Sequence, residues 1–138
     1  MIRLFLLLTP AYAALSQAAQ LDVIQQNELV FFLISAEKGD EISLEKADFS
    51  LIYGLDLQIY RPDTLYSLRG QDIDFQFPET ITLSEAMVVG RSIARKQLAA
   101  LFQLKQAGRY RMVATLCLSN GRCLDKVELP LEFYHSDF

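Results

Sequence analysis

The chain has 138 residues, of which 51% are hydrophobic, and its formal net charge is −4 at pH 7. This length suits one domain with a core of its own, and the acidic balance argues against nucleic acid as the main partner. One histidine and two cysteines leave few side chains for catalysis or for metal binding.

The first 18 residues have the features of a secretory signal peptide. One arginine precedes an unbroken apolar run over 4–8, Pro10 ends the run, and small residues allow cleavage after Ala13 or after Ala18. A membrane span needs about 20 apolar residues, so this stretch is too short, and no later stretch is long enough to span a bilayer. We expect cleavage after Ala18, an exported protein in the periplasm or outside the cell, and a single β-sandwich domain over 19–138.

Along this domain, short apolar or alternating runs are separated by turn signals, which is the pattern of an all-β protein. Alternation with period two predicts strands over 55–60, 72–77, 110–118 and 127–133, and the apolar run 29–34 predicts another. Such alternation places one set of side chains inward and the other in water. The sequence therefore predicts an antiparallel β-sandwich.

The last two predicted strands form a hairpin with a definite register. Asn120-Gly121, which separates them, is the strongest short-range hairpin signal because both residues tolerate positive φ. A two-residue turn at this point gives one consistent set of cross-strand pairs. These are Ala114 with Val127, Met112 with Leu129, Tyr110 with Leu131, and Arg109 with Glu132.

Cys117 and Cys123 flank this turn, and two cysteines in an exported protein predict a disulfide. The two-residue turn, however, places Cys117 opposite Leu124 and on the face away from Cys123. The bond therefore requires an odd loop over 119–121 with a left-handed glycine, and a second irregularity that restores the inward face of 127–133. A redox-active pair is disfavoured because the Cys-x-x-Cys spacing is missing.

Residues 104–112 begin with a leucine, continue to Gly108 four positions later, and reach Tyr110 at the start of an alternating strand. This segment resembles the tyrosine corner of the immunoglobulin-like β-sandwich superfamily, and the resemblance covers about residues 101–133. It implies a Greek-key sandwich and no particular activity. The core tryptophan and the long-range cysteine pair of antibody-type domains are absent from the sequence, which favours the broader superfamily.

One segment does not follow the β pattern. Residues 92–106 are rich in good helix formers, Ser92 is a possible N-cap, and Gly108 lies just beyond the end. Two alternatives remain open: one short helix within 84–106, or a strand that leads into the tyrosine corner.

The sequence contains no recognisable catalytic or cofactor-binding motif. His135 lies in a polar tail, which favours a solvated residue over a general base, and the glycines are too widely spaced for a phosphate loop. Asp72 and Asp74 would lie about 7 Å apart on one strand face, which leaves open a calcium or sugar site, although two solvated carboxylates are the simpler interpretation. We therefore expect no enzyme activity, no cofactor and no metal.

Charge is unevenly distributed along the chain. Residues 21–89 contain 4 basic and 13 acidic residues, whereas residues 90–126 contain 8 basic and 1 acidic. Either the two segments are neighbours and their fields partly cancel, or the basic residues form a patch that attracts an anionic partner such as an acidic protein face, a polysaccharide or lipid head groups. The candidate patch residues are Arg91, Arg95, Lys96, Lys105, Arg109 and Arg111.

The run 29–34 is apolar on both faces, so both faces should be covered. The cover is the segment 92–106, a central position in the sheet, or another chain, and in the last case Val30, Phe32 and Ile34 are the candidate contact residues.

Together, these patterns predict an exported, non-catalytic binding or assembly module of the cell envelope or extracellular space. The expected partner is another protein there or an anionic surface. An exported inhibitor that blocks a hydrolase with the loop 60–64 or the turn 119–122 is the alternative.

Overall fold

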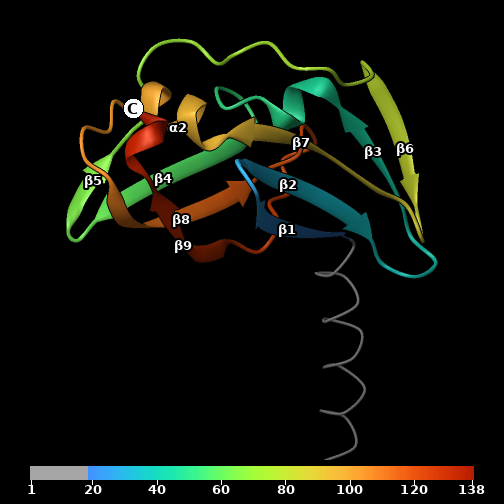
Figure 1. Ribbon diagram of the computed structural model, residues 1–138. Helices are drawn as coiled ribbons and strands as arrows, with labels where there is room; N and C mark the ends of the chain where they lie inside the picture. The colour runs from blue at the N-terminus through green and yellow to red at the C-terminus, as the bar shows by residue number, and fades with distance from the viewer. Residues whose placement is uncertain (1–18) are drawn as a thin grey trace, which may run out of the picture.

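The computed structural model describes residues 19–138, so the predicted signal peptide lies outside the described residues. Within this range the chain forms three antiparallel sheets and little helix (Figure 1). One sheet has the order β1-β2-β7, with β1 at Ala19–Gln26, β2 at Leu29–Ala36 and β7 at Val88–Ala94. The largest has the order β5-β4-β8-β9, with β5 at Thr64–Tyr66, β4 at Leu55–Arg61, β8 at Gly108–Leu116 and β9 at Val127–Phe133. The third pairs β3 (Glu41–Glu45) with β6 (Thr80–Ser84).

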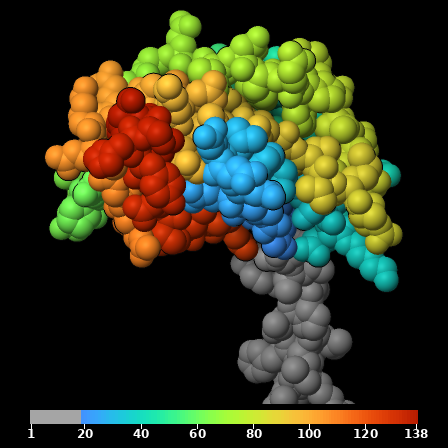
Figure 2. All heavy atoms as spheres, in the orientation of Figure 1, coloured from blue at the N-terminus to red at the C-terminus, as the bar shows by residue number. Residues whose placement is uncertain are grey.

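The helical elements are short. They are the 3-10 turn η1 (Lys46–Phe49), the helix α2 (Arg95–Leu101) and the 3-10 turn η2 (His135–Asp137). In Figure 1, α2 lies near the C-terminus at one end of the molecule, β3 and β6 lie at the other, and the segment from β5 to β6 arches over the top. The space-filling view has the same arrangement, with the C-terminal residues (red) at one end (Figure 2). Among residues 19–138, no helix has the length and apolar character needed to cross a bilayer.

One continuous apolar core joins the sheets. Inward side chains of β2, β4, β8 and β9 are fully buried in it, among them Phe32, Ile59, Met112 and Leu131. The expected all-β, sandwich-like fold of antiparallel strands is confirmed. Membership of the immunoglobulin-like superfamily remains a prediction.

The tyrosine corner that the resemblance implies has its characteristic hydrogen bond. The Tyr110 hydroxyl donates to the Gln106 carbonyl at 2.7 Å, which ties the start of β8 to the preceding loop. Gly108 permits this path because its φ is 136°, and a Cβ there would lie 2.9 Å from the Arg61 guanidinium.

The C-terminal hairpin has the predicted register along its strands. Arg109, Tyr110, Met112 and Ala114 pair with Glu132, Leu131, Leu129 and Val127, as expected. Pro130 lies in β9, at the edge of its sheet, opposite Arg111. An edge strand is the place where a sheet tolerates proline, since proline has no N–H to donate to a ladder.

The tip of this hairpin contains the predicted disulfide and the predicted odd loop. Cys117 and Cys123 are bonded and directly opposed. The Leu118 N–H donates to the Arg122 carbonyl at 2.7 Å, which leaves three loop residues between them, and Gly121 has a φ of +91°. The segment 124–126 shifts the pairing by one residue and so restores the inward face of β9.

The expected strand over 72–77 is wrong. Ile73, Phe75 and Phe77 do pack partly buried against the core, as the alternation predicts, but within residues 19–138 no other segment pairs with this one. The Asp72 carboxylate bonds to Arg91 and to the Leu51 N–H, and the Phe77 ring packs 4.8 Å from that of Phe49. Side-chain contacts thus hold this extended loop over the core, although its backbone pairs with no strand of the described residues.

Of the two alternatives for 92–106, the short helix is correct. It begins later than the predicted cap because Ser92 pairs with Phe31 in the sheet. The side chain of Gln97 accepts the Ala94 N–H at 3.1 Å, and the chain leaves the helix at Gln103, whose φ is 52°.

Candidate functional site

The three side chains expected to contact a partner lie inside the domain. Val30, Phe32 and Ile34 are 0% exposed because they point from β2 into the core. Neighbouring strands and the second sheet cover this face of β2, so the prediction that these residues form a contact surface is corrected. The cover of this face is internal, which was one of the alternatives that the sequence left open, but the expectation that both faces are covered is wrong.

The opposite face of β2 remains partly in water. Phe31 and Leu33 are partly exposed, and they lie beside apolar residues of the same sheet that are more exposed. We call this set the outer apolar face: Ile24 (47% exposed), Leu29 (37%), Val88 (59%), Phe31 and Leu33.

These residues are adjacent in the sheet. Ile24 pairs with Phe31 across β1 and β2, and Leu33 lies opposite Gly90. Gly90 is required there, since a Cβ would lie 2.9 Å from the Leu33 side chain and closer still to the β2 backbone. The sequence could have indicated Leu29, Phe31 and Leu33 from the same apolar run, but it did not indicate Ile24, because β1 was not predicted.

The outer apolar face carries almost no charge. Twelve residues of the three strands share this face of the sheet, and Asp22 is the only ionisable side chain among them. The remaining positions are Gln20, Gln26, Ser35, Gly90, Ser92 and Ala94. An uncharged apolar strip of this kind is typical of the centre of a protein interface.

The basic residues do not form one patch. Arg91 and Arg95 are only 4% and 6% exposed. Arg91 binds Asp72 at 2.7 Å, and Arg95 binds Asp137 at 3.2 Å and also donates to the Asn27 carbonyl. Their roles are therefore structural, which corrects their prediction as contact residues.

The other predicted basic residues lie in two separate places. Lys96 and Lys105 border a shallow hollow of about 410 Å³ beside α2 and the C-terminal Phe138. Arg109 and Arg111 lie on the outer face of the four-stranded sheet, and both are exposed.

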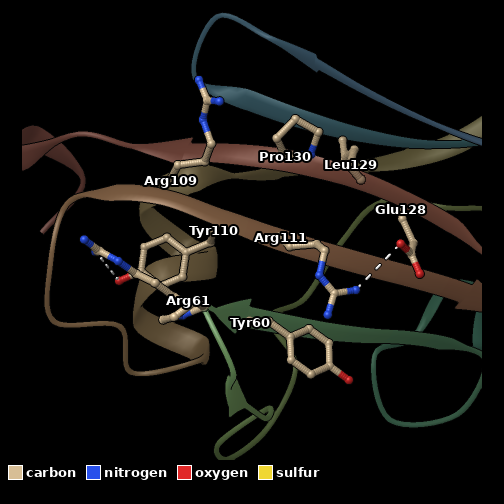
Figure 3. Close-up of a pocket in the computed structure, with 9 residues that line it drawn as sticks. Tyr60, Arg61, Arg109, Tyr110, Arg111, Glu128, Leu129 and Pro130 are labelled. Atoms are coloured by element: carbon tan, nitrogen blue, oxygen red, sulfur yellow. Dashed lines mark hydrogen bonds and ion pairs between the residues drawn. The ribbon is translucent and has the colours of Figure 1, made fainter.

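Arg109 and Arg111 help to line an open cleft of about 570 Å³ (Figure 3), which we call the tyrosine–arginine cleft. β4 and the turn after it supply one side, β8 the floor, and β9 the other side. The lining residues are Tyr60, Arg61, Pro62, Arg109, Tyr110, Arg111, Glu128, Leu129 and Pro130.

Aromatic rings hold two guanidinium groups of this cleft. The Arg111 guanidinium lies 4.3 Å from the ring centre of Tyr60, its neighbour across β4 and β8, and that of Arg61 lies 5.0 Å from the Tyr110 ring. Glu128 approaches Arg111 at 3.7 Å, as the dashed line in Figure 3 shows. Three cations and one carboxylate therefore line the cleft.

Asp72 and Asp74 both border a hollow of about 420 Å³, but their carboxylates have separate partners. The Asp72 side chain is 8% exposed and its oxygens bind Arg91 and Leu51, whereas the Asp74 side chain is 96% exposed, 3.7 Å from Lys46. Over residues 19–138 no three His, Cys, Asp or Glu side chains are grouped as metal ligands would be. The hypothesis of a calcium site at this pair is therefore not supported, and the sugar site stays a prediction.

The two loops of the inhibitor alternative differ. Arg61 turns back and donates to the Ala107 carbonyl at 2.8 Å, so its side chain does not project from the loop 60–64. The turn 119–122 is exposed and held in place, because the Ser119 N–H donates to Asp48 at 3.0 Å and its hydroxyl to Glu45 at 2.6 Å.

No protein-family model, no curated protein and no solved structure matches this chain. Support for a function therefore comes from the surfaces described above.

Proposed function

We propose that this protein is an exported, non-catalytic assembly module that docks onto another protein of the cell envelope or extracellular space. The observation that carries the proposal is the outer apolar face, where Ile24, Leu29 and Val88 are 47%, 37% and 59% exposed on one sheet with a single neighbouring charge. The largest apolar patch on a typical monomer covers roughly 300–600 Å² and often marks an interaction site.

The size of this face suits a reversible contact. Three strands about 4.8 Å apart and seven or eight residues long, at ~3.3 Å per residue, give a footprint of roughly 400 Å². Specific stable interfaces bury about 800 Å² per partner, so the face alone supports a modest affinity. A partner that also contacts the surrounding loops would bind more tightly.

Export is supported by the leader-like pattern of the first 18 residues and by the disulfide, a bond that persists mainly in oxidising compartments. When the full chain is produced in an exporting host, we expect the protein in the envelope fraction or the medium to begin at Ala19, which is also where β1 begins. Intact-mass measurement checks the new terminus. Recovery of the protein only from the cytosol with Met1 or the whole leader retained would contradict export.

The docking surface is tested by placing charges on it. The double variant Ile24→Arg with Val88→Arg should capture about tenfold less of its binding partner in a pull-down from envelope extract, because both guanidinium groups would be desolvated on binding. Ile52→Arg is the matched control, since Ile52 is 54% exposed on a turn away from this face. Equal capture by the double variant and the unchanged protein, at equal thermal stability, would rule out this surface.

An inhibitor that acts through the turn 119–122 is the second candidate. It is favoured by the disulfide at the base of the turn and by the bonds from Ser119 to Asp48 and Glu45, which hold the backbone in place as binding loops require. Capture of a hydrolase in the same pull-down, unaffected by the double variant, would favour this candidate.

A further inference from the structure

The strand β1 has a free edge. It pairs with β2 on one side, and no segment of residues 19–138 pairs with it on the other. Within the same residues, no backbone hydrogen bond from a turn or loop reaches it. In Figure 1, β1 forms the lower border of its sheet, with β2 between it and β7. With eight residues, β1 is the longest strand at a sheet edge in the described part of the chain.

The turn between β1 and β2 determines which backbone groups of β1 point to this edge. Asn27 and Glu28 form a two-residue turn, Gln26 pairs with Leu29 across it, and the Asn27 φ is 57°. Such a turn closes with a hydrogen bond between its flanking residues, so the backbone of Gln26 faces β2. Because this orientation alternates along an antiparallel strand, every second residue points its N–H and C=O groups to the free edge. These residues are Ala19, Leu21, Val23 and Gln25.

The other sheet edges are shorter or partly blocked. Proteins protect strand edges with charge, with proline or by keeping the strand short. β9 contains Pro130, β5 has three residues, and β3 and β6 have five each. At the end of β7, the Gln97 side chain already accepts the Ala94 N–H. β1 has no proline and a single charged residue, Asp22, so its edge is the one best suited to accept a further strand.

The core is incompletely covered where this edge lies. β1 packs against β9, and inward side chains of both strands stay only partly buried, namely Val23 of β1 and Val127 and Leu129 of β9. A hollow of about 280 Å³ lies beside the first half of β1, between residues 19–22 and 125–127. An added strand with apolar side chains on its inner face would bury more of this surface.

The outward side chains of β1 indicate the charge of such a strand. They are Gln20, Asp22, Ile24 and Gln26, so Asp22 is the only charge in the row. Opposite charges at directly opposed positions stabilise a pair of strands, and like charges destabilise it. A basic side chain opposite Asp22 is therefore favoured.

A second copy of β1 fits this edge poorly. In an antiparallel pair that uses all the free backbone groups, Ala19 would face Gln25 and Leu21 would face Val23 of the second copy. This register places Asp22 directly opposite Asp22 of the second copy, where the like charges destabilise the pair.

We infer that the free edge of β1 binds an extended segment of the partner protein as an added β-strand, with a basic side chain opposite Asp22. Ala19, Leu21, Val23 and Gln25 would supply the backbone hydrogen bonds, and apolar side chains of the segment would cover the inner surface beside Val23. The inference rests on the proposed docking of another protein. It adds how that protein is recognised, which is by backbone pairing at the border of the sheet that carries the outer apolar face.

The test is an NMR titration of the ¹⁵N-labelled protein that begins at Ala19, with capped peptides. The probe is Lys-Val-Thr-Val-Lys-Val-Thr, and Glu-Val-Thr-Val-Glu-Val-Thr is the control of opposite charge. Two further probes each carry one N-methyl group, either on the central valine, whose N–H would point to β1, or on the threonine before it, whose N–H would point away.

We expect saturable shifts of the Leu21 and Gln25 amides with the unmethylated lysine peptide. Affinity should fall about tenfold when the central valine is methylated or when the lysines are replaced by glutamate, because a backbone hydrogen bond or the pairing with Asp22 is then lost. Methylation of the threonine should leave the affinity unchanged.

Variants of the protein test the same edge. Val23→Pro removes an outward N–H and no bond between β1 and β2, so the fold should persist while peptide affinity falls about tenfold. Val23→Thr keeps the N–H and the shape of the side chain, so this matched control should bind as the unchanged protein does. Val88→Arg changes the outer apolar face two strands away and should also bind the peptide normally.

The inference is overturned by the absence of saturable shifts at millimolar peptide, by equal affinity of the two methylated peptides, or by equal binding of the glutamate peptide. Shifts of the same amides on raising the protein concentration without peptide would also overturn it, since a second copy would then occupy the edge. If Val23→Pro does not fold, the methylated peptides still decide.

Failure of this inference and failure of the proposed docking face are separate results. Peptide binding at β1, together with equal pull-down capture by Ile24→Arg with Val88→Arg, would contradict only the outer apolar face. Loss of capture by that double variant without any peptide binding would contradict only the added strand.

Discussion

Replacing Arg91 by alanine should lower the free energy of unfolding by about 3–5 kcal/mol, because the substitution leaves a buried carboxylate without its counter-charge. The side chains of Arg91 and Asp72 are 1% and 8% exposed, and their closest atoms are 2.7 Å apart. Arg91 also donates to the Phe49 carbonyl at 2.9 Å and stacks 3.8 Å from the Phe75 ring. In its absence Asp72 keeps the Leu51 N–H as a partner and loses its cation.

Urea unfolding measures this loss, and an exposed pair supplies the control. Lys46 lies 3.7 Å from Asp74, with side chains 32% and 96% exposed, so Lys46→Ala should cost about 1 kcal/mol or less. If Arg91→Ala proved as mild as Lys46→Ala, the loop over 67–79 would not depend on the buried ion pair.

Replacing Phe32 by alanine should cost about 3–5 kcal/mol, since Phe32 is 0% exposed and its removal opens a cavity in the core. Its neighbour Phe31 points to the outer apolar face and is partly exposed, so Phe31→Ala should cost clearly less, about 1 kcal/mol.

Urea unfolding of the two phenylalanine variants compares the same chemical change on the two faces of one strand. Similar losses for both would mean that the outer face is covered in solution, for example by a second copy of the chain. A dependence of the Phe31→Ala result on protein concentration would then identify that copy.

The parts of the fold that the sequence predicted well are those in which local signals agree. In the C-terminal hairpin, the Asn120-Gly121 turn, the alternation and the opposed Arg109 and Glu132 all favour one register, and the structure has it. The shifted tip was also foreseeable, since Cys117 and Cys123 can face each other only across an odd loop.

An alternating pattern of apolar and polar residues shows which side chains are buried, but it does not show that the segment pairs with a neighbouring strand. This explains the error at 72–77. Ile73, Phe75 and Phe77 contact the core from a loop, and their pattern is the same as that of a half-buried strand. The sequence also could not choose between the faces of 29–34, because both are apolar and the choice depends on strands distant in the chain.

The candidate site was harder to predict because the charge of a residue does not show whether its side chain is buried or exposed. Arg91 and Arg95 resemble Arg109 and Arg111 in the sequence, but their partners Asp72 and Asp137 lie 19 and 42 residues away. Those partners become neighbours only when the sheets assemble. The tyrosine of the cleft, Tyr60, became recognisable only through the pairing of β4 with β8.

The position of Pro130 limits association of this protein through one edge of its largest sheet. A bare strand edge invites the edge of another molecule, and repetition of that contact produces fibres without a defined end. With one donor missing from β9, growth by this route is interrupted at the exposed side of the largest sheet. Association of this protein through the edge of β9 is therefore disfavoured.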